Sequence, residues 1–146
     1  MVNLQDYEDY WNEIKNRVPG IGKIIPISFD ADIAKYVQDL SSADLPVLFV
    51  ITPTSEPDSD DPDGCLEINY SMLLLLDKID TQRKKTNQIQ KELQPIFEKL
   101  KSKMKAEYSR GGVLSDLVIS SMKSVPEAGL FATMSGWSLS FNFKTE

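Results

Sequence analysis

Apolar residues near the start of the chain recur at helical spacing. They lie three or four positions apart, at Leu4, Tyr7, Trp11, Ile14 and Val18. Such a stripe predicts an amphipathic helix with one buried face. Asn3 is suited to cap the start of this helix, and Pro19-Gly20 ends it.

The next segments are short and apolar. Lys23–Phe29 predicts a strand whose Pro26, lacking an N–H, belongs at a sheet edge or a bulge. Asp30 or Asp32 is suited to cap a short helix with apolar positions at Ile33, Val37 and Leu40. Leu45–Thr52 is a nearly continuous apolar run with several β-branched residues, which predicts a strand buried on both faces.

Residues 66–77 alternate between two faces. One face carries Leu66, Ile68, Tyr70, Met72, Leu74 and Leu76, and the other begins with Glu67, Asn69 and Ser71. This period of two predicts a long strand that forms a hairpin with the preceding one. The intervening residues 53–64 contain three prolines, one glycine and five acidic residues, so we expect a mobile loop at the hairpin tip.

A long helix is predicted from Thr81 to about Tyr108. Its apolar stripe consists of Ile89, Leu93, Ile96, Leu100 and Met104. Asp80 or Thr81 is suited to cap its start, and Ser109–Gly112 ends it. Pro95 lies inside this segment and should kink the helix or split it in two.

The remaining residues predict two more strands, Leu117–Val125 and Trp137–Phe143. Pro126–Gly129 predicts a turn between them, and Leu130–Gly136 is part strand and part connection. In the last strand Trp137, Leu139, Phe141 and Phe143 alternate inward, while Ser138, Ser140 and Asn142 alternate outward.

These elements predict an α+β fold in a single domain spanning residues 1–146. A chain of this length typically forms one hydrophobic core. We expect a single antiparallel or mixed β-sheet. The N-terminal helix and the long, Pro-kinked second helix should pack on one of its faces.

Charge limits the kinds of partner. The net charge is −6 and the pI is about 4.7, which disfavours broad nucleic-acid binding. Basic residues cluster at Arg83–Lys85 and again at Lys99, Lys101, Lys103 and Lys105. Acidic residues dilute the second cluster, so a solvated helix face is favoured over a specific nucleic-acid patch.

Residue types limit the chemistry. The chain has no histidine, which removes the usual Ser-His-Asp and Cys-His systems, so we expect neither catalysis nor a cofactor. The single Cys65 allows no intramolecular disulfide and suits a reducing compartment. The N-terminus lacks the features of a signal peptide, and no apolar run is long enough to span a bilayer. We therefore expect a protein that is made in the cytoplasm and has no membrane partner.

The acidic loop is the most obvious candidate site. Asp58, Asp60, Asp61 and Asp63 supply carboxylate oxygens of the kind that Ca²⁺ prefers. Their spacing does not fit an EF-hand, because the loop would end at Tyr70 where a bidentate Glu is required. A solvated hairpin tip is the simpler interpretation, and docking on the basic surface of a partner is the third.

Three other positions carry weaker signals. Cys65 has carboxylates for neighbours and no His base, which disfavours a reactive thiol. Gly111-Gly112 beside Arg110 is a candidate phosphate nest, but is more typical of a helix end. Tyr10 lies beside the buried stripe and is a candidate interface anchor, with boundary packing as the plainer interpretation.

Five segments together resemble a known family. They are LQDYEDYWNEI at the start, the strand entered through LPVLFVITP, the acidic loop with its long strand, the long helix, and the closing GWSLSFNF. In this order they resemble the small tail-terminator and tail-completion proteins of tailed bacteriophages. The resemblance spans nearly the whole chain. It lies in the order of the segments and in their general residue character.

That resemblance implies a particular role. It implies a sheet flanked by helices and a homo-oligomeric ring, often a hexamer, that caps the tail tube and contacts the neck or connector proteins. It also implies a place in the virion and no active site. A ring needs heterologous faces, and an edge strand with a long hairpin provides one.

Two alternatives stay open. One is a cytosolic adaptor or regulatory domain that binds a protein partner as a monomer or dimer. The other is a small carboxylate-based enzyme, which requires a deep pocket with two facing acids.

Overall fold

The chain folds into a mixed β-sheet with helices on both faces. The computed structural model describes residues 1–28, 33–80, 82 and 84–146. The strands are β1 (Lys23–Ile27), β2 (Val47–Ile51), β3 (Thr54–Pro57), β4 (Glu67–Lys78), β5 (Leu117–Leu130) and β6 (Met134–Thr145). The helices are α1 (Leu4–Arg17), α2 (Ile33–Asp39) and α3 (Thr86–Ala106), with a 3-10 turn at Ser42–Asp44.

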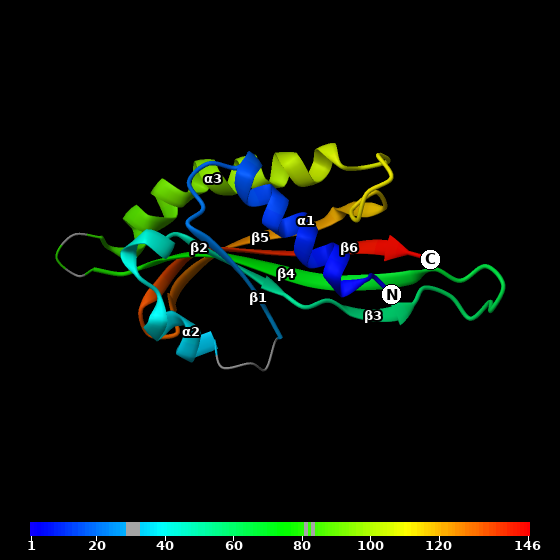
Figure 1. The fold of residues 1–146 in the computed structure, drawn as a ribbon, viewed down its shortest axis with the longest axis horizontal. Helices are drawn as coiled ribbons and strands as arrows, with labels where there is room; N and C mark the ends of the chain where they lie inside the picture. Colours follow the sequence, from blue (N-terminus) through cyan, green and yellow to red (C-terminus); the bar gives the residue numbers. More distant parts are fainter. Residues whose placement is uncertain (29–32, 81, 83) are drawn as a thin grey trace.

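The sheet has six strands, ordered β1-β2-β4-β6-β5, and β3 pairs with β4 beside β2. Only β1 and β2 are parallel; the other described pairs are antiparallel. Figure 1 shows α1 and α3 over one face and α2 under the other face at one end. The predicted α+β class with a mixed sheet is therefore confirmed, as is the packing of both main helices on one face.

Two apolar clusters lie on the two faces of the sheet. α1 and α3 cover the larger cluster, which includes Leu48 and Val50 of β2. α2 covers the smaller one, which includes Phe49 and Ile51 of the same strand. Every residue of β2 is buried, so the predicted two-sided burial is confirmed. β1 is an edge strand, as its proline predicted.

α1 begins where the sequence predicts. The Asn3 side chain accepts a hydrogen bond from the Asp6 N–H at 3.0 Å, which confirms the N-cap. Tyr7, Trp11 and Ile14 are buried, but Leu4 is 46% exposed, so its place on the buried stripe was wrong. The cap predicted for α2, Asp30 or Asp32, lies outside the described residues.

β4 keeps the predicted period of two, but its polar residues face the helices. Asn69 and Ser71 are buried under α1, whereas Tyr70 is exposed on the opposite face. The prediction that apolar positions mark the buried face was therefore wrong for the first half of β4. Burial is tolerated because both polar side chains are hydrogen-bonded there.

α3 is shorter at its start than predicted. Asp80 exchanges backbone hydrogen bonds with Lys84, and the helix begins only at Thr86. The prediction that Asp80 caps the helix was therefore wrong. The other predicted cap, Thr81, lies outside the described residues. Pro95 lies within one uninterrupted helix, so the helix is not split, and a kink stays a prediction. Phe97 is fully buried, whereas Ile96 of the predicted stripe is only partly so.

β5 is longer than predicted and borders the sheet. The predicted turn at Pro126–Gly129 was wrong, because these residues continue the strand and the chain turns at residues 131–133. A proline is compatible with this position because an edge strand has one unpaired side. A wide bulge separates Val118 from Lys123, and within it the Ser121 hydroxyl accepts the Asn142 N–H at 2.8 Å.

β6 buries Leu139, Phe141 and Phe143 as predicted. Trp137 is partly exposed, and its indole N–H donates to the Gln90 carbonyl at 2.9 Å. Ser138 is buried on the other face, contrary to the prediction, because its hydroxyl donates to the Glu127 carboxylate at 2.8 Å.

Candidate interaction surfaces

A hairpin arm, residues 54–70, extends from one end of the sheet. Part of the predicted loop is in fact strand, because Thr54–Pro57 form β3 and pair with the first residues of β4. Across this ladder the Tyr70 hydroxyl donates to the Glu56 carboxylate at 2.6 Å, which raises the pKa of Tyr70. Figure 1 shows the tip of the arm, residues 58–66, reaching beyond both chain ends.

Asp58 anchors the base of the tip. Its carboxylate accepts the Leu66 N–H at 2.9 Å and lies 3.3 Å from the Lys144 ammonium. The Leu66 hydrogen bond first, and then Lys144, lower the pKa of Asp58 below its usual range. Its side chain is only 15% exposed, so this residue holds the arm to β6 and is poorly placed to meet a partner.

Asp60, Asp61 and Asp63 form the exposed end of the tip. The Asp61 carboxylate accepts the Asp63 N–H at 3.0 Å, which shapes the turn. Throughout the described ranges, no three His, Cys, Asp or Glu side chains gather closely enough to hold a metal ion. The Ca²⁺ interpretation therefore gains no support here, whereas docking on a basic surface stays a prediction.

The net charge of the protein is concentrated in this arm. Residues 54–70 contain six carboxylates, two Glu and four Asp, and no Lys or Arg. The whole chain has 22 acidic and 16 basic residues, so the rest of the molecule is neutral. The arm is thus a strongly acidic projection from an otherwise balanced surface.

A basic patch lies at the C-terminal end of α3. We define it as Lys99, Lys103, Lys105 and Arg110. Lys99 and Lys105 are exposed, and among the described residues none of the four is within ion-pair distance of a carboxylate. Lys101 differs, because it pairs with Glu98 at 2.9 Å and lies over the Phe97 ring. The neighbouring Glu107 pairs with Arg17 at 3.6 Å, so it offsets little of the positive charge of the patch.

Tyr10 is boundary packing in this structure. Its ring meets Trp11 edge to face at 4.9 Å and is partly buried against the larger cluster. The hydroxyl is buried without a hydrogen-bond partner among the described residues, and burial raises the pKa of Tyr10. Its geometry offers little exposed ring to a partner.

The face opposite α1 and α3 is open where α2 does not cover it. One hollow opens on this face, and a second adjoins it at the β5 border of the sheet, since Asn142 of the first pairs in register with Val118 of the second. The first, about 260 Å³, is lined mainly by apolar atoms of Ile51, Tyr70, Met72 and Phe141. The second, about 650 Å³, is lined by Leu66, Tyr108, Leu117, Val118 and Ile119 together with polar neighbours. Tyr70, Tyr108 and Ile119 are exposed large hydrophobic residues, which is typical of a protein-binding surface.

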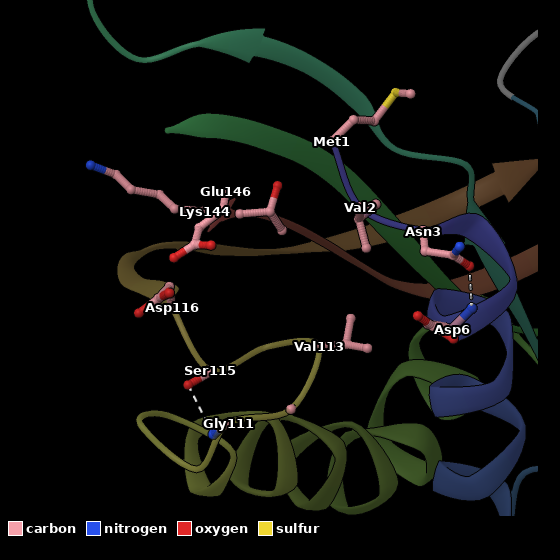
Figure 2. Close-up of a pocket in the computed structure, with 12 residues that line it drawn as sticks. Met1, Val2, Asn3, Asp6, Gly111, Val113, Ser115, Asp116, Lys144 and Glu146 are labelled. Atoms are coloured by element: carbon pink, nitrogen blue, oxygen red, sulfur yellow. Dashed lines mark hydrogen bonds between the residues drawn. The ribbon is translucent and has the colours of Figure 1, made fainter. Parts of the chain in front are cut away.

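A third pocket lies between the two chain ends (Figure 2). It has a volume of about 580 Å³ and is lined by residues 1–3, the loop after α3 and the end of β6. Asp6 and Asp116 line it but are exposed to solvent, so it is not the deep pocket that a carboxylate-based enzyme requires. The carboxylate-enzyme alternative gains no support from this pocket.

The weaker candidates stay weak. The Gly111 N–H donates to the Ser115 hydroxyl at 3.0 Å, visible in Figure 2, so it is not free to bind phosphate. The Cys65 thiol is partly buried and donates to the carbonyls of Ser59 and Leu66. Neither contact supports a phosphate site at Gly111 or a reactive thiol at Cys65.

Two features did not follow from the sequence patterns. The lysines of α3 match a solvated helix face, and their separation along the chain from the acidic arm is the signal that points to a binding surface instead. The buried polar contacts of Asn69 and Ser71 had no signal, because alternation alone does not say which face is covered.

Similarity to known proteins assigns no family. No protein-family model matches the chain, and no curated protein shows significant similarity to it. The resemblance to phage tail-terminator proteins is therefore still a prediction from the sequence. Of the helices in the described part of the chain, none is long and apolar enough to cross a membrane.

Proposed function

We propose that this protein is a structural subunit of a tailed-phage virion. In this proposal identical subunits form a ring, such as a hexamer, that terminates the tail tube and joins it to the neck. The protein acts by binding and not by catalysis. It is made in the bacterial cytoplasm and ends in the virion.

The observation that carries this proposal is the acidic arm. Its tip, residues 58–66, reaches beyond both chain ends, and the whole arm carries six carboxylates without a basic residue. Ring contacts are heterologous, so each subunit needs two different surfaces that fit each other. The arm and the basic patch on α3 are two such surfaces within one chain. The resemblance in segment order supports the same assignment.

Assembly state is the direct test. We expect light scattering on the purified chain to give a mass several times that of the monomer, and electron microscopy to show closed rings. Tubes of the tail-tube protein encoded in the same genome should carry these rings at their ends. A chain that stays monomeric, and leaves tube length and tube ends unchanged, contradicts the proposal.

A cytosolic protein-binding adaptor is the second candidate. The open sheet face favours it, because two adjoining hollows expose apolar side chains on it and at its β5 border. An adaptor would be a monomer or a dimer under all conditions. Capture of a partner that is lost in a Met72→Asp variant, without any ring, would support this candidate over the first.

A further inference from the structure

We infer that the arm tip of one copy docks on the α3 basic patch of a second copy. This contact rests on the proposed ring and specifies where neighbouring subunits meet. The receiving surface is the outer side of α3 near its C-terminal end, and the occupant is the tip with Asp60 and Asp63.

Charge complementarity identifies the occupant. The tip has the strongest acidic character of the chain, and Lys99 and Lys105 are exposed basic side chains near the C-terminal end of α3. Among the described residues, Asp60 and Asp63 on one side and Lys99 and Lys105 on the other have no ion-pair partner within the same chain. Opposite charges left unpaired on two surfaces steer those surfaces toward each other.

The arm is held away from its own patch. The β3–β4 ladder keeps the arm in the sheet, and the Asp58–Lys144 ion pair ties its base to β6. Figure 1 shows the tip extending along the sheet while α3 lies above the sheet. A contact between tip and patch is therefore intermolecular, and because the two surfaces differ it is heterologous.

The receiving surface has room for a hairpin. Ser102 and Ala106 are short exposed side chains on the outer side of α3, between the flanking Lys99 and Lys105. Exposed charge pairs are individually weak and are screened by salt, so they set orientation and rate more than affinity. We therefore expect this contact to weaken as salt is raised from about 0.01 M, where screening is long-range, to about 1 M.

A charge-swap experiment on the full chain tests the contact. The arm variant carries Asp60→Lys and Asp63→Lys, the patch variant carries Lys99→Glu and Lys105→Glu, and the combined variant carries all four. The matched control, Asp9→Lys with Asp39→Lys, changes the charge as much as the arm variant at exposed positions outside both surfaces. Circular dichroism verifies that each variant folds, and sedimentation velocity at low salt measures self-association.

We expect each reversed variant to associate about tenfold more weakly than the wild type, and the control to match the wild type. The combined variant should recover association, because a basic tip then meets an acidic patch. A mixture of the arm and patch variants should also recover it, since each supplies the partner that the other needs.

Three results would overturn the inference. If the wild type forms rings and neither the arm variant nor the patch variant weakens them, this contact is absent, but the proposed ring is not contradicted. If both reversals weaken assembly but the combined variant does not recover, the two surfaces do not meet each other. If the wild type is monomeric, both the contact and the proposed ring on which it rests fail.

Discussion

The Tyr7 hydroxyl donates a hydrogen bond to the Ser71 hydroxyl at 2.7 Å and so joins α1 to the centre of β4. Ser71 in turn donates to the Ile51 carbonyl at 2.7 Å, which extends the chain of hydrogen bonds to β2. Both side chains are buried, and burial raises the pKa of Tyr7. α1 is therefore positioned by a buried polar contact as well as by apolar packing.

Removing the acceptor, the Ser71 hydroxyl, should destabilise the fold more than removing the donor, the Tyr7 hydroxyl. Ser71→Ala leaves the buried Tyr7 hydroxyl without this partner, so we expect a loss of about 1–3 kcal/mol in the free energy of unfolding. Tyr7→Phe leaves Ser71 with its bond to Ile51, so its cost should be smaller, about 1 kcal/mol. Urea unfolding of both variants measures the difference.

The double variant separates the shared contact from other effects. In Tyr7→Phe with Ser71→Ala, no buried hydroxyl is left behind, so the total cost should fall below the sum of the single costs. Strict additivity would mean that the two hydroxyls do not interact in solution.

Gly136 should not tolerate a side chain. An added Cβ would overlap the Leu75 carbonyl oxygen of the paired strand β4, and the Gly136 φ of 155° is rarely adopted by other residues. We expect Gly136→Ala to lower the free energy of unfolding by about 3 kcal/mol, measured by thermal or urea unfolding.

Gly112 supplies the comparison. An added Cβ there would meet only a Glu107 oxygen, at an ordinary 3.7 Å, so Gly112→Ala should be nearly neutral. Equal losses for the two variants would refute a steric cause at Gly136.

Acid should release the base of the arm. The pKa of Asp58 is lowered in the folded protein by the Leu66 N–H and by Lys144, so its stabilising effect is complete at neutral pH. The effect is lost as the pH falls from the usual Asp range of about 4 through the lower folded pKa. The stability difference between the wild type and Asp58→Asn should therefore be largest at neutral pH and shrink below pH about 4.

Urea unfolding across this pH range measures that difference. Asp60→Asn is the matched control, because Asp60 has no hydrogen-bond or ion-pair partner among the described residues. A gap between wild type and Asp58→Asn that grows in acid would have the wrong sign and would contradict the prediction.

Ser121 should stabilise the bulge of β5. Its hydroxyl accepts the Asn142 N–H and donates to the Val118 carbonyl at 2.6 Å, replacing bonds that the bulge removes from the ladder. We expect Ser121→Ala to cost about 1 kcal/mol and to speed hydrogen exchange of the Asn142 amide. The exposed neighbour Ser120 provides a control, and Ser120→Ala should leave that amide protected.

Most elements followed from local patterns, but their surroundings did not. The stripe of α1 and the apolar run of β2 depend on periodicity, which the sequence contains. Which face of β4 is covered depends on where α1 packs, and the arrival of Tyr7 makes a polar position such as Ser71 suitable for burial. Pro126 signalled a turn, yet it is accommodated because β5 borders the sheet, a property of topology and not of local sequence.

Some features of the candidate surfaces were also predictable from the sequence, and others depend on the packed structure. The acidity of Asp60, Asp61 and Asp63 was visible in the sequence, whereas the anchoring of Asp58 by Lys144 joins residues 86 positions apart. The ring of Tyr10 was placed correctly beside the stripe, but its enclosure against Trp11 required the packed structure.

The interrupted border formed by β5 has a consequence for crowded conditions. An uninterrupted outer strand is a template on which further chains can stack by backbone hydrogen bonding, and such stacking leads to amyloid-like deposits. The Ser121 bulge breaks the regular spacing of that template, and Pro126 removes one of its donors. We therefore expect copies at high concentration to stack poorly along β5 by backbone hydrogen bonding.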